Sequence, residues 1–157
     1  MSYTPPSRES IYAALFELVR GTEGLKTVSR KLTSLAQVAS EEKPALYQLQ
    51  VEEDVKHDLG SGMPYLNKAR VEIYVFVSQE DSALPNSPPL NALVDAVVAI
   101  LWPTEASPPS DERQTLGGLV EDVRIDGKIE YREGGPIGPH AMAVIPIEML
   151  IAGLQPD

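Results

Sequence analysis

The chain has 157 residues, no cysteine and a formal net charge of −10. A chain of this length is expected to form a single domain over residues 1–157, with a core that needs no covalent or metal cross-links. The lack of cysteine excludes disulfides, thiolate metal sites and cysteine nucleophiles, and the negative charge argues against general binding to the nucleic-acid backbone.

The first ten residues contain no cationic segment followed by an apolar stretch, so they predict no secretory signal and we expect synthesis in the cytoplasm. Apolar residues then recur with helical spacing, which predicts an amphipathic helix over residues 7–20. Ser7 is a suitable N-cap for it. Gly21 and Gly24 are C-terminal stop signals.

The pattern over residues 25–64 is less regular. Residues 25–32 predict a weak strand, whose lysines are typical of a sheet edge, and residues 33–43 fit a turn or a short helix equally well. Residues 47–52 alternate between apolar and polar, which predicts a half-exposed strand. Residues 53–64 are rich in charge, glycine and proline and predict a loop.

The segment 69–78 alternates without a break, and we expect it to be the central strand of the sheet. One of its faces is wholly aliphatic and is predicted to pack against helices. The other face changes from Arg70 and Glu72 to Tyr74 and Phe76, which predicts a second buried surface at that end.

A second amphipathic helix is predicted from the helical spacing of five apolar residues. Ser87 is its expected cap, two prolines occupy its first turn, and Trp102 with Pro103 ends it. We expect Trp102 to plug the core. No apolar run here or elsewhere approaches the ~20 residues of a membrane span. The five buried-face residues are Leu90, Leu93, Val94, Val97 and Leu101.

Residues 104–118 have the composition of a mobile loop, and loops of this length within a domain are often functional. Asp126 and Gly127 then form a two-residue turn signal that predicts a β-hairpin. A closing strand follows over residues 143–151, and Pro146 places it at a sheet edge or at a bulge.

Together these elements predict an α/β chain of the α+β type. The expected sheet is mixed and largely antiparallel, with two amphipathic helices packed on one face, plus a β-hairpin around Asp126 and Gly127. A fold of this kind does not by itself indicate a function.

No catalytic motif is present. His57 and His140 are too far apart in sequence for a metal-binding motif, and the carboxylates between Glu52 and Asp58 lack the spaced ligands and the turn glycine of a calcium loop. No glycine-rich phosphate loop and no nucleophile elbow occurs. We therefore predict no catalytic residues, no cofactor and no metal, and the protein is not expected to be an enzyme.

Charge is unevenly distributed along the chain. Residues 1–31 contain five basic and three acidic residues, a balance of +2, whereas residues 80–126 contain nine acidic and two basic residues, a balance of −7. Such a chain can meet copies of itself, or a charged partner, head to tail. The alternative is that both regions are ordinary solvated faces.

In the order of its segments the chain resembles the tail terminator family of long-tailed bacteriophages, small proteins that cap the tail tube. The likeness covers nearly the whole chain. The segments that carry it are RESIYAALFELV, TVSRKL, PALYQLQVEE, ARVEIYVFV, LNALVDAVVAIL, LGGLVEDVRIDGKI and AVIPIEMLI.

The resemblance implies two helices against a mixed sheet, a homohexameric ring at the head-proximal end of a virion tail, and contacts with the major tail tube protein and a neck or connector protein. It implies neither sequence-specific nucleic-acid recognition nor membrane contact, and it supplies no catalytic residues. Two alternatives remain at this point: a head-closure or neck protein, and a monomeric small-molecule binding module that uses the aromatic face at Tyr74 and Phe76.

Four residues are predicted to lie at a subunit or tube interface. Arg30 and Lys31 belong to the basic end and the expected edge strand, where association would depend on salt. Glu112 and Arg113 belong to the 104–118 loop, which we expect to become ordered against a neighbouring subunit or the tube.

Overall fold

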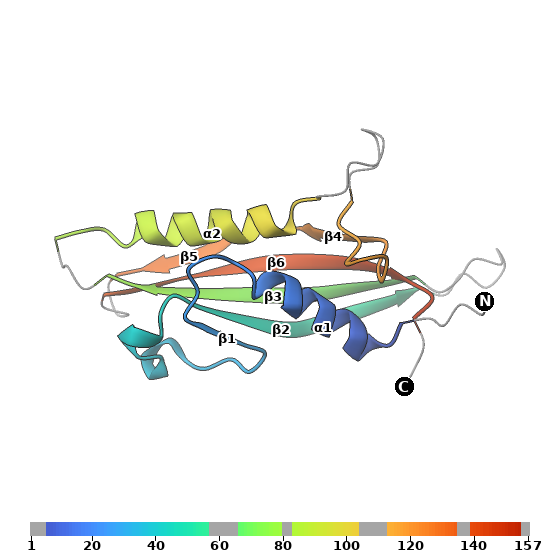
Figure 1. The fold of residues 1–157 in the computed structure, drawn as a ribbon, viewed down its shortest axis with the longest axis horizontal. Coiled ribbons are helices and arrows are strands. Elements are labelled where there is room, and N and C mark those ends of the chain that lie inside the picture. The colour runs from blue at the N-terminus through green and yellow to red at the C-terminus, as the bar shows by residue number, and fades with distance from the viewer. Residues whose placement is uncertain (1–5, 57–65, 80–82, 104–112, 135–138, 155–157) are drawn as a thin grey trace.

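The computed structural model describes residues 6–56, 66–79, 83–103, 113–134 and 139–154 (Figure 1). The described strands form one sheet in the order β1-β2-β3-β6-β4, and β5 pairs with β6. Among the described strands, only the β1–β2 pair is parallel. This mixed, mostly antiparallel sheet with two helices confirms the predicted α+β fold. The elements are α1 (Arg8–Val19), β1 (Thr27–Ser29), the short 3₁₀ helices η1 (Leu35–Gln37) and η2 (Ser40–Glu42), β2 (Ala45–Lys56), β3 (Leu66–Ser78), α2 (Ser87–Leu101), β4 (Asp122–Ile125), β5 (Glu130–Glu133) and β6 (His140–Ala152).

Both helices cover the same face of the sheet (Figure 1). The aliphatic face of β3 and the alternate residues of β6 lie under them and are buried. All five apolar residues that predicted the second helix are buried on α2. The predicted packing of helices on the aliphatic face of the central strand is therefore confirmed. The other end of β3 also matches its prediction, since Phe76 is buried on the opposite face of the sheet.

Polar contacts hold α1 on β2. The Tyr12 hydroxyl donates to Glu53 Oε1 at 3.0 Å, and Arg8 Nε lies 2.9 Å from the other oxygen of the same carboxylate. Gln48 Nε2 donates to the backbone oxygen of Tyr12 at 2.9 Å. Burial and the hydrogen bond to Glu53 raise the pKa of Tyr12 above its usual value, so its hydroxyl remains a donor.

The first helix begins as predicted, because Ser7 Oγ accepts from the backbone N–H of Ser10 at 3.2 Å. The prediction for the second helix is wrong in one detail. Its N-cap is Asn86, and the hydroxyl of Ser87 instead donates to the Glu133 carboxylate at 2.7 Å. The start of α2 is thereby fastened to β5.

The predicted loop over residues 53–64 begins too early. Strand β2 continues to Lys56, past a bulge between Gln50 and Glu52, because the start of β3 supplies hydrogen-bonding partners along this stretch. Pairing with a neighbour overrides the local composition there. Residues 57–64 lie outside the described residues. The ambiguous stretch 33–43 contains η1 and η2, and the predicted edge strand over 25–32 is shortened to Thr27–Ser29.

The predicted hairpin around Asp126 and Gly127 is wrong. Strands β4 and β5 do not pair with each other, and both pair antiparallel with β6 along the edge that β3 leaves free. Between them, the backbone N–H of Asp126 donates to the carbonyl of Pro146 at 3.1 Å. The proline has no N–H to donate, so the ladder breaks opposite it. Pro146 thus lies on an interior strand, opposite the gap between β4 and β5, and the predicted position at a sheet edge is wrong.

Candidate assembly interface

The sheet has two edges: β1 forms one, and β4 together with β5 forms the other (Figure 1). The outer edge of each faces no further strand in the described part of the chain. End strands present backbone groups that pair readily with other chains, unless charge or covering elements prevent it. These two edges are therefore the candidate surfaces for a contact with another protein.

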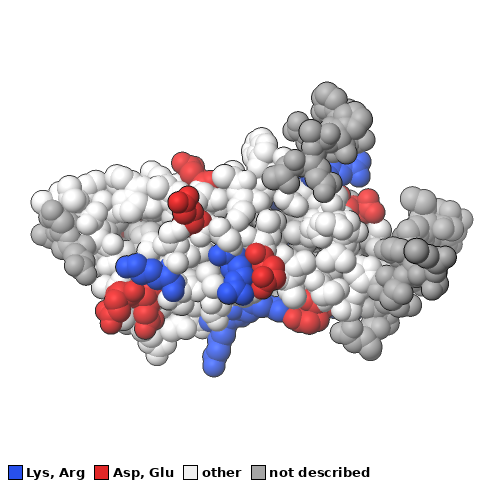
Figure 2. All heavy atoms as spheres, viewed as in Figure 1, with Lys and Arg blue, Asp and Glu red and all other residues white. Residues whose placement is uncertain are grey.

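The β1 edge is basic and contains the predicted pair Arg30 and Lys31. Arg30 is turned toward the body of the protein, where its guanidinium bonds the Glu9 carboxylate and lies 3.3 Å from Gln50 Oε1. The hydrogen bond from Arg30 and the positive charge of its guanidinium lower the pKa of Glu9. Lys31 is exposed and forms no ion pair with the described residues. Figure 2 shows basic side chains at the margin where Figure 1 places β1.

Of the predicted residues in the 104–118 loop, the structure describes Arg113, which lies at the other edge. Glu112 falls outside the described residues, as do residues 104–111. Arg113 Nη1 lies 3.8 Å from Glu121 Oε2, immediately before β4. The structure thus separates the predicted interface residues onto opposite edges of the sheet and does not gather them in one patch.

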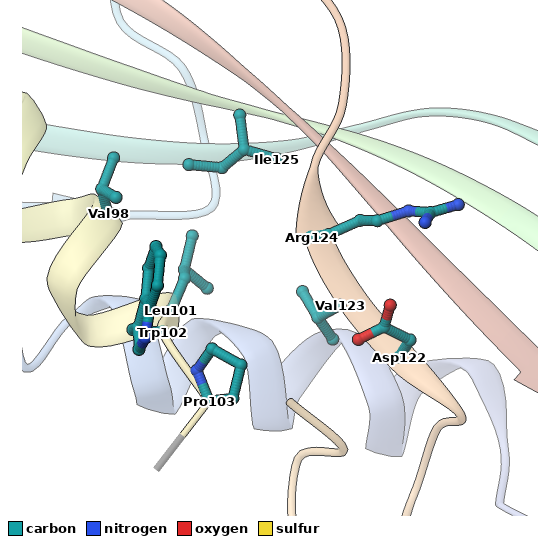
Figure 3. Close-up of a pocket in the computed structure, with 8 residues that line it drawn as sticks. All are labelled: Val98, Leu101, Trp102, Pro103, Asp122, Val123, Arg124 and Ile125. Carbon is teal, nitrogen blue, oxygen red and sulfur yellow. The ribbon is translucent and has the colours of Figure 1, made fainter. Parts of the chain in front are cut away.

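A pocket of about 400 Å³ lies beside β4, at the C-terminal end of α2 (Figure 3). Its lining is mostly apolar and includes two charged residues, Asp122 and Arg124. Trp102 is 61% exposed, so the prediction that it plugs the core is wrong. The buried stripe of α2 ends at Leu101, and the following residue has an extended backbone before Pro103, which directs the indole out of the core. The lining residues are Val98, Leu101, Trp102, Pro103, Asp122, Val123, Arg124 and Ile125.

The face of the sheet opposite the helices has a charged end. A row of alternating charge crosses four strands there in register, from Glu52 through Arg70 and Glu148 to Arg124. Arg124 donates to Glu148 at 3.2 Å, which raises the pKa of the guanidinium, and Arg70 lies 4.0 Å from Glu52. These charges are largely satisfied within the chain.

The acidic cluster that sequence reasoning considered for calcium is divided by the strand. Glu53 points to α1, whereas Glu52 and Asp54 pair with β3 on the opposite face, and Asp58 lies outside the described residues. In the described part of the chain, no three acidic, histidine or cysteine side chains form a group that could hold a metal ion.

The aromatic end of the same face is filled by the chain itself. Phe76 packs on Tyr47 with ring centroids 5.3 Å apart, and residues of η1 and the following turn cover both rings. Phe76 is only 2% exposed. The aromatic surface that was considered for small-molecule binding is therefore part of a second core.

A buried cation borders this second core. Lys43 Nζ lies 2.7 Å from Nδ1 of His140, and Lys43 is 3% exposed. Burial lowers the pKa of Lys43, while burial and the neighbouring lysine lower the pKa of His140. A lysine ammonium carries donors only, so Nδ1 of the imidazole is the acceptor in this hydrogen bond. Sequence reasoning missed it because the two residues are 97 positions apart.

No helix in the described part of the chain is long and apolar enough to cross a membrane. No protein-family model matches the sequence, and no curated protein is similar to it in sequence. The fold is similar to that of a chain in the solved structure described as "Virion of native gene transfer agent (GTA) particle", with a TM-score of 0.52 at 13% sequence identity. The match covers 90% of this chain and 93% of that chain. At this identity the likeness establishes a shared fold over nearly the full length of both proteins.

Proposed function

We propose that this protein is a structural component of a phage-like virion, where it caps the tail tube as a ring, ends tail polymerisation and provides the surface for head attachment. The observation that carries the proposal is the fold shared with a chain of a gene transfer agent virion, over 90% of this chain. The role as tail terminator rests in addition on the resemblance of the sequence segments to that family. No enzymatic activity is part of the proposal.

Two features of the structure support ring formation. A closed ring of identical subunits needs two different and complementary patches on each subunit. The sheet offers two such edges, a basic one with Lys31 and one with Glu121, Asp122 and the pocket at Trp102. We propose a homohexamer that contacts the major tail tube protein on one side and a neck or connector protein on the other, at the head-proximal end of the tail. Arg30, Lys31, Glu112 and Arg113 are the proposed interface residues.

A head-closure or neck protein is the second candidate, because it is also a small ring-forming virion component and the same fold likeness supports it. Tail length separates the two. If the chain ends tube polymerisation, its loss should give tubes longer than normal. If it joins heads to finished tails, its loss should leave tails of normal length without heads.

The experiment therefore has two parts. Light scattering and negative-stain imaging of the purified chain, alone and with tail tubes, measure ring formation, and particles that lack the gene are imaged for tail length. Rings together with over-long tails support the terminator role. A monomer at every concentration, with and without tubes, would overturn the proposal.

A further inference from the structure

The β1 edge presents two lysines and one leucine to solvent. Lys26 and Lys31 flank the strand and are exposed, and neither forms an ion pair with a described residue. Leu32, the next residue, is 37% exposed. Arg30 is already bound to Glu9 within the subunit. The charges available to a partner at this edge are thus the two lysines, with an apolar side chain directly beside Lys31.

The β4 edge has the opposite chemistry. Asp122 begins this strand and Asp126 follows it, and neither forms an ion pair within 4.0 Å among the described residues, although the charge of Arg124 acts on both. The cation between them, Arg124, is bound to Glu148. Asp122 also lines the pocket of about 400 Å³ that contains the exposed Trp102. This edge therefore offers two carboxylates and, beside one of them, a hollow with apolar walls (Figure 3).

We propose that the β1 edge of one subunit docks antiparallel on the β4 edge of a second copy, with Leu32 in the Trp102 pocket and Lys31 facing Asp122. Lys26 and Asp126 then lie toward the other end of the contact, one register step apart. Opposite charges flank the contact and apolar groups meet beside one pair. The inference rests on the proposed function, since it names the contact that closes the ring.

Reciprocal charge reversal tests the contact in the full-length chain. Lys31→Asp and Asp122→Lys are each expected to weaken self-association about tenfold, measured by sedimentation velocity, because like charges would meet. The chain that carries both substitutions should associate as the wild type does. Asp95→Lys, on the exposed side of α2, is the matched control for Asp122→Lys and should leave association unchanged.

The apolar half of the contact has its own pair of variants. Leu32→Ser is expected to weaken association by a similar factor, since it removes the side chain that enters the pocket. Val51→Ser is the control, because Val51 is 46% exposed but lies at the bulge on the open face. Equal effects of the two serine variants would contradict the placement of Leu32.

A cysteine pair gives a readout that does not depend on affinity, because the chain has no cysteine of its own. Under oxidation, a chain with Lys31→Cys and Asp122→Cys should form a ladder of disulfide-linked oligomers, whereas each single variant should stop at dimers. A disulfide needs Cα atoms within about 7 Å, so the ladder would place the two edges in contact.

The outcomes separate this inference from the proposed function. If the wild type forms rings but the double charge variant is not restored and no ladder appears, the two edges do not meet and the inference is wrong, while ring formation stands. If the wild type is monomeric under every condition, with and without tail tubes, the proposed function itself is wrong.

Discussion

The packing of α2 on the sheet can be tested by shortening one buried side chain. Leu90 is fully buried against the aliphatic face of the sheet. Leu90→Ala removes three carbons at ~0.8 kcal/mol each and leaves a cavity, so the free energy of unfolding should fall by about 3 to 5 kcal/mol. For a chain of this size the midpoint of thermal unfolding should fall by roughly 6 to 20 °C. Urea unfolding followed by circular dichroism measures the change.

Leu84→Ala is the matched control, because Leu84 is 53% exposed just before the same helix. It removes the same atoms from solvent-exposed surface, and its effect should stay within about 0.5 kcal/mol. If Leu90→Ala changed the free energy of unfolding as little as Leu84→Ala does, α2 would not pack on the sheet as described.

Three further predictions concern single contacts. Tyr12→Phe removes the hydroxyl that donates to Glu53 and should cost about 1 to 2 kcal/mol in urea unfolding, with the helix content unchanged. Gly127→Ala should lower the free energy of unfolding more than Gly118→Ala does. Both residues have positive φ, but only at Gly127 would the new Cβ lie 3.3 Å from a proline ring carbon. Equal losses in urea unfolding would refute that close approach. His140→Gln should reduce the stability lost on acidification from pH 7 to pH 5. The folded-state pKa of His140 lies below its ordinary value of about 6.5, so the unfolded chain binds this proton more readily and stability falls as pH drops through that range; equal losses in both proteins would contradict it.

The sequence predicted correctly those elements whose buried residues are marked by a periodic pattern within one continuous segment. The alternation of β3 and the helical spacing of α2 state which side chains are buried, whatever element lies opposite. The hairpin prediction failed because a turn signal does not state which partner a strand will choose. Strands β4 and β5 both pair with the free edge of β6, and the missing N–H of Pro146 interrupts the pairing between them. Strand β6 is not contiguous with either strand in sequence, so the turn signal could not reveal this partner.

The candidate interface was predictable only in its net charge. Arg30 and Lys31 are adjacent and look equivalent in sequence, yet Arg30 binds Glu9, which is 21 positions away. Lys31 forms no ion pair with a described residue, so its charge is available to another protein. The Trp102 pocket could not be foreseen, since its walls come from the end of α2 and from β4. A pattern within one helix fixes where the helix ends, but not which distant strand borders that end.

The two sheet edges differ from edges that only avoid pairing. Natural sheets protect such edges with charge, short strands and proline, and the lysines beside β1 fit that use. A single exposed apolar side chain is common on a protein surface and needs no explanation by itself, so what matters is where the apolar groups lie relative to charge. Leu32 and Trp102 are exposed on opposite edges. Leu32 follows Lys31, and Trp102 lines the same pocket as Asp122; neither of these charges forms an ion pair within 4.0 Å with a described residue. This arrangement favours edges that are kept for one specific partner over edges that are kept only soluble.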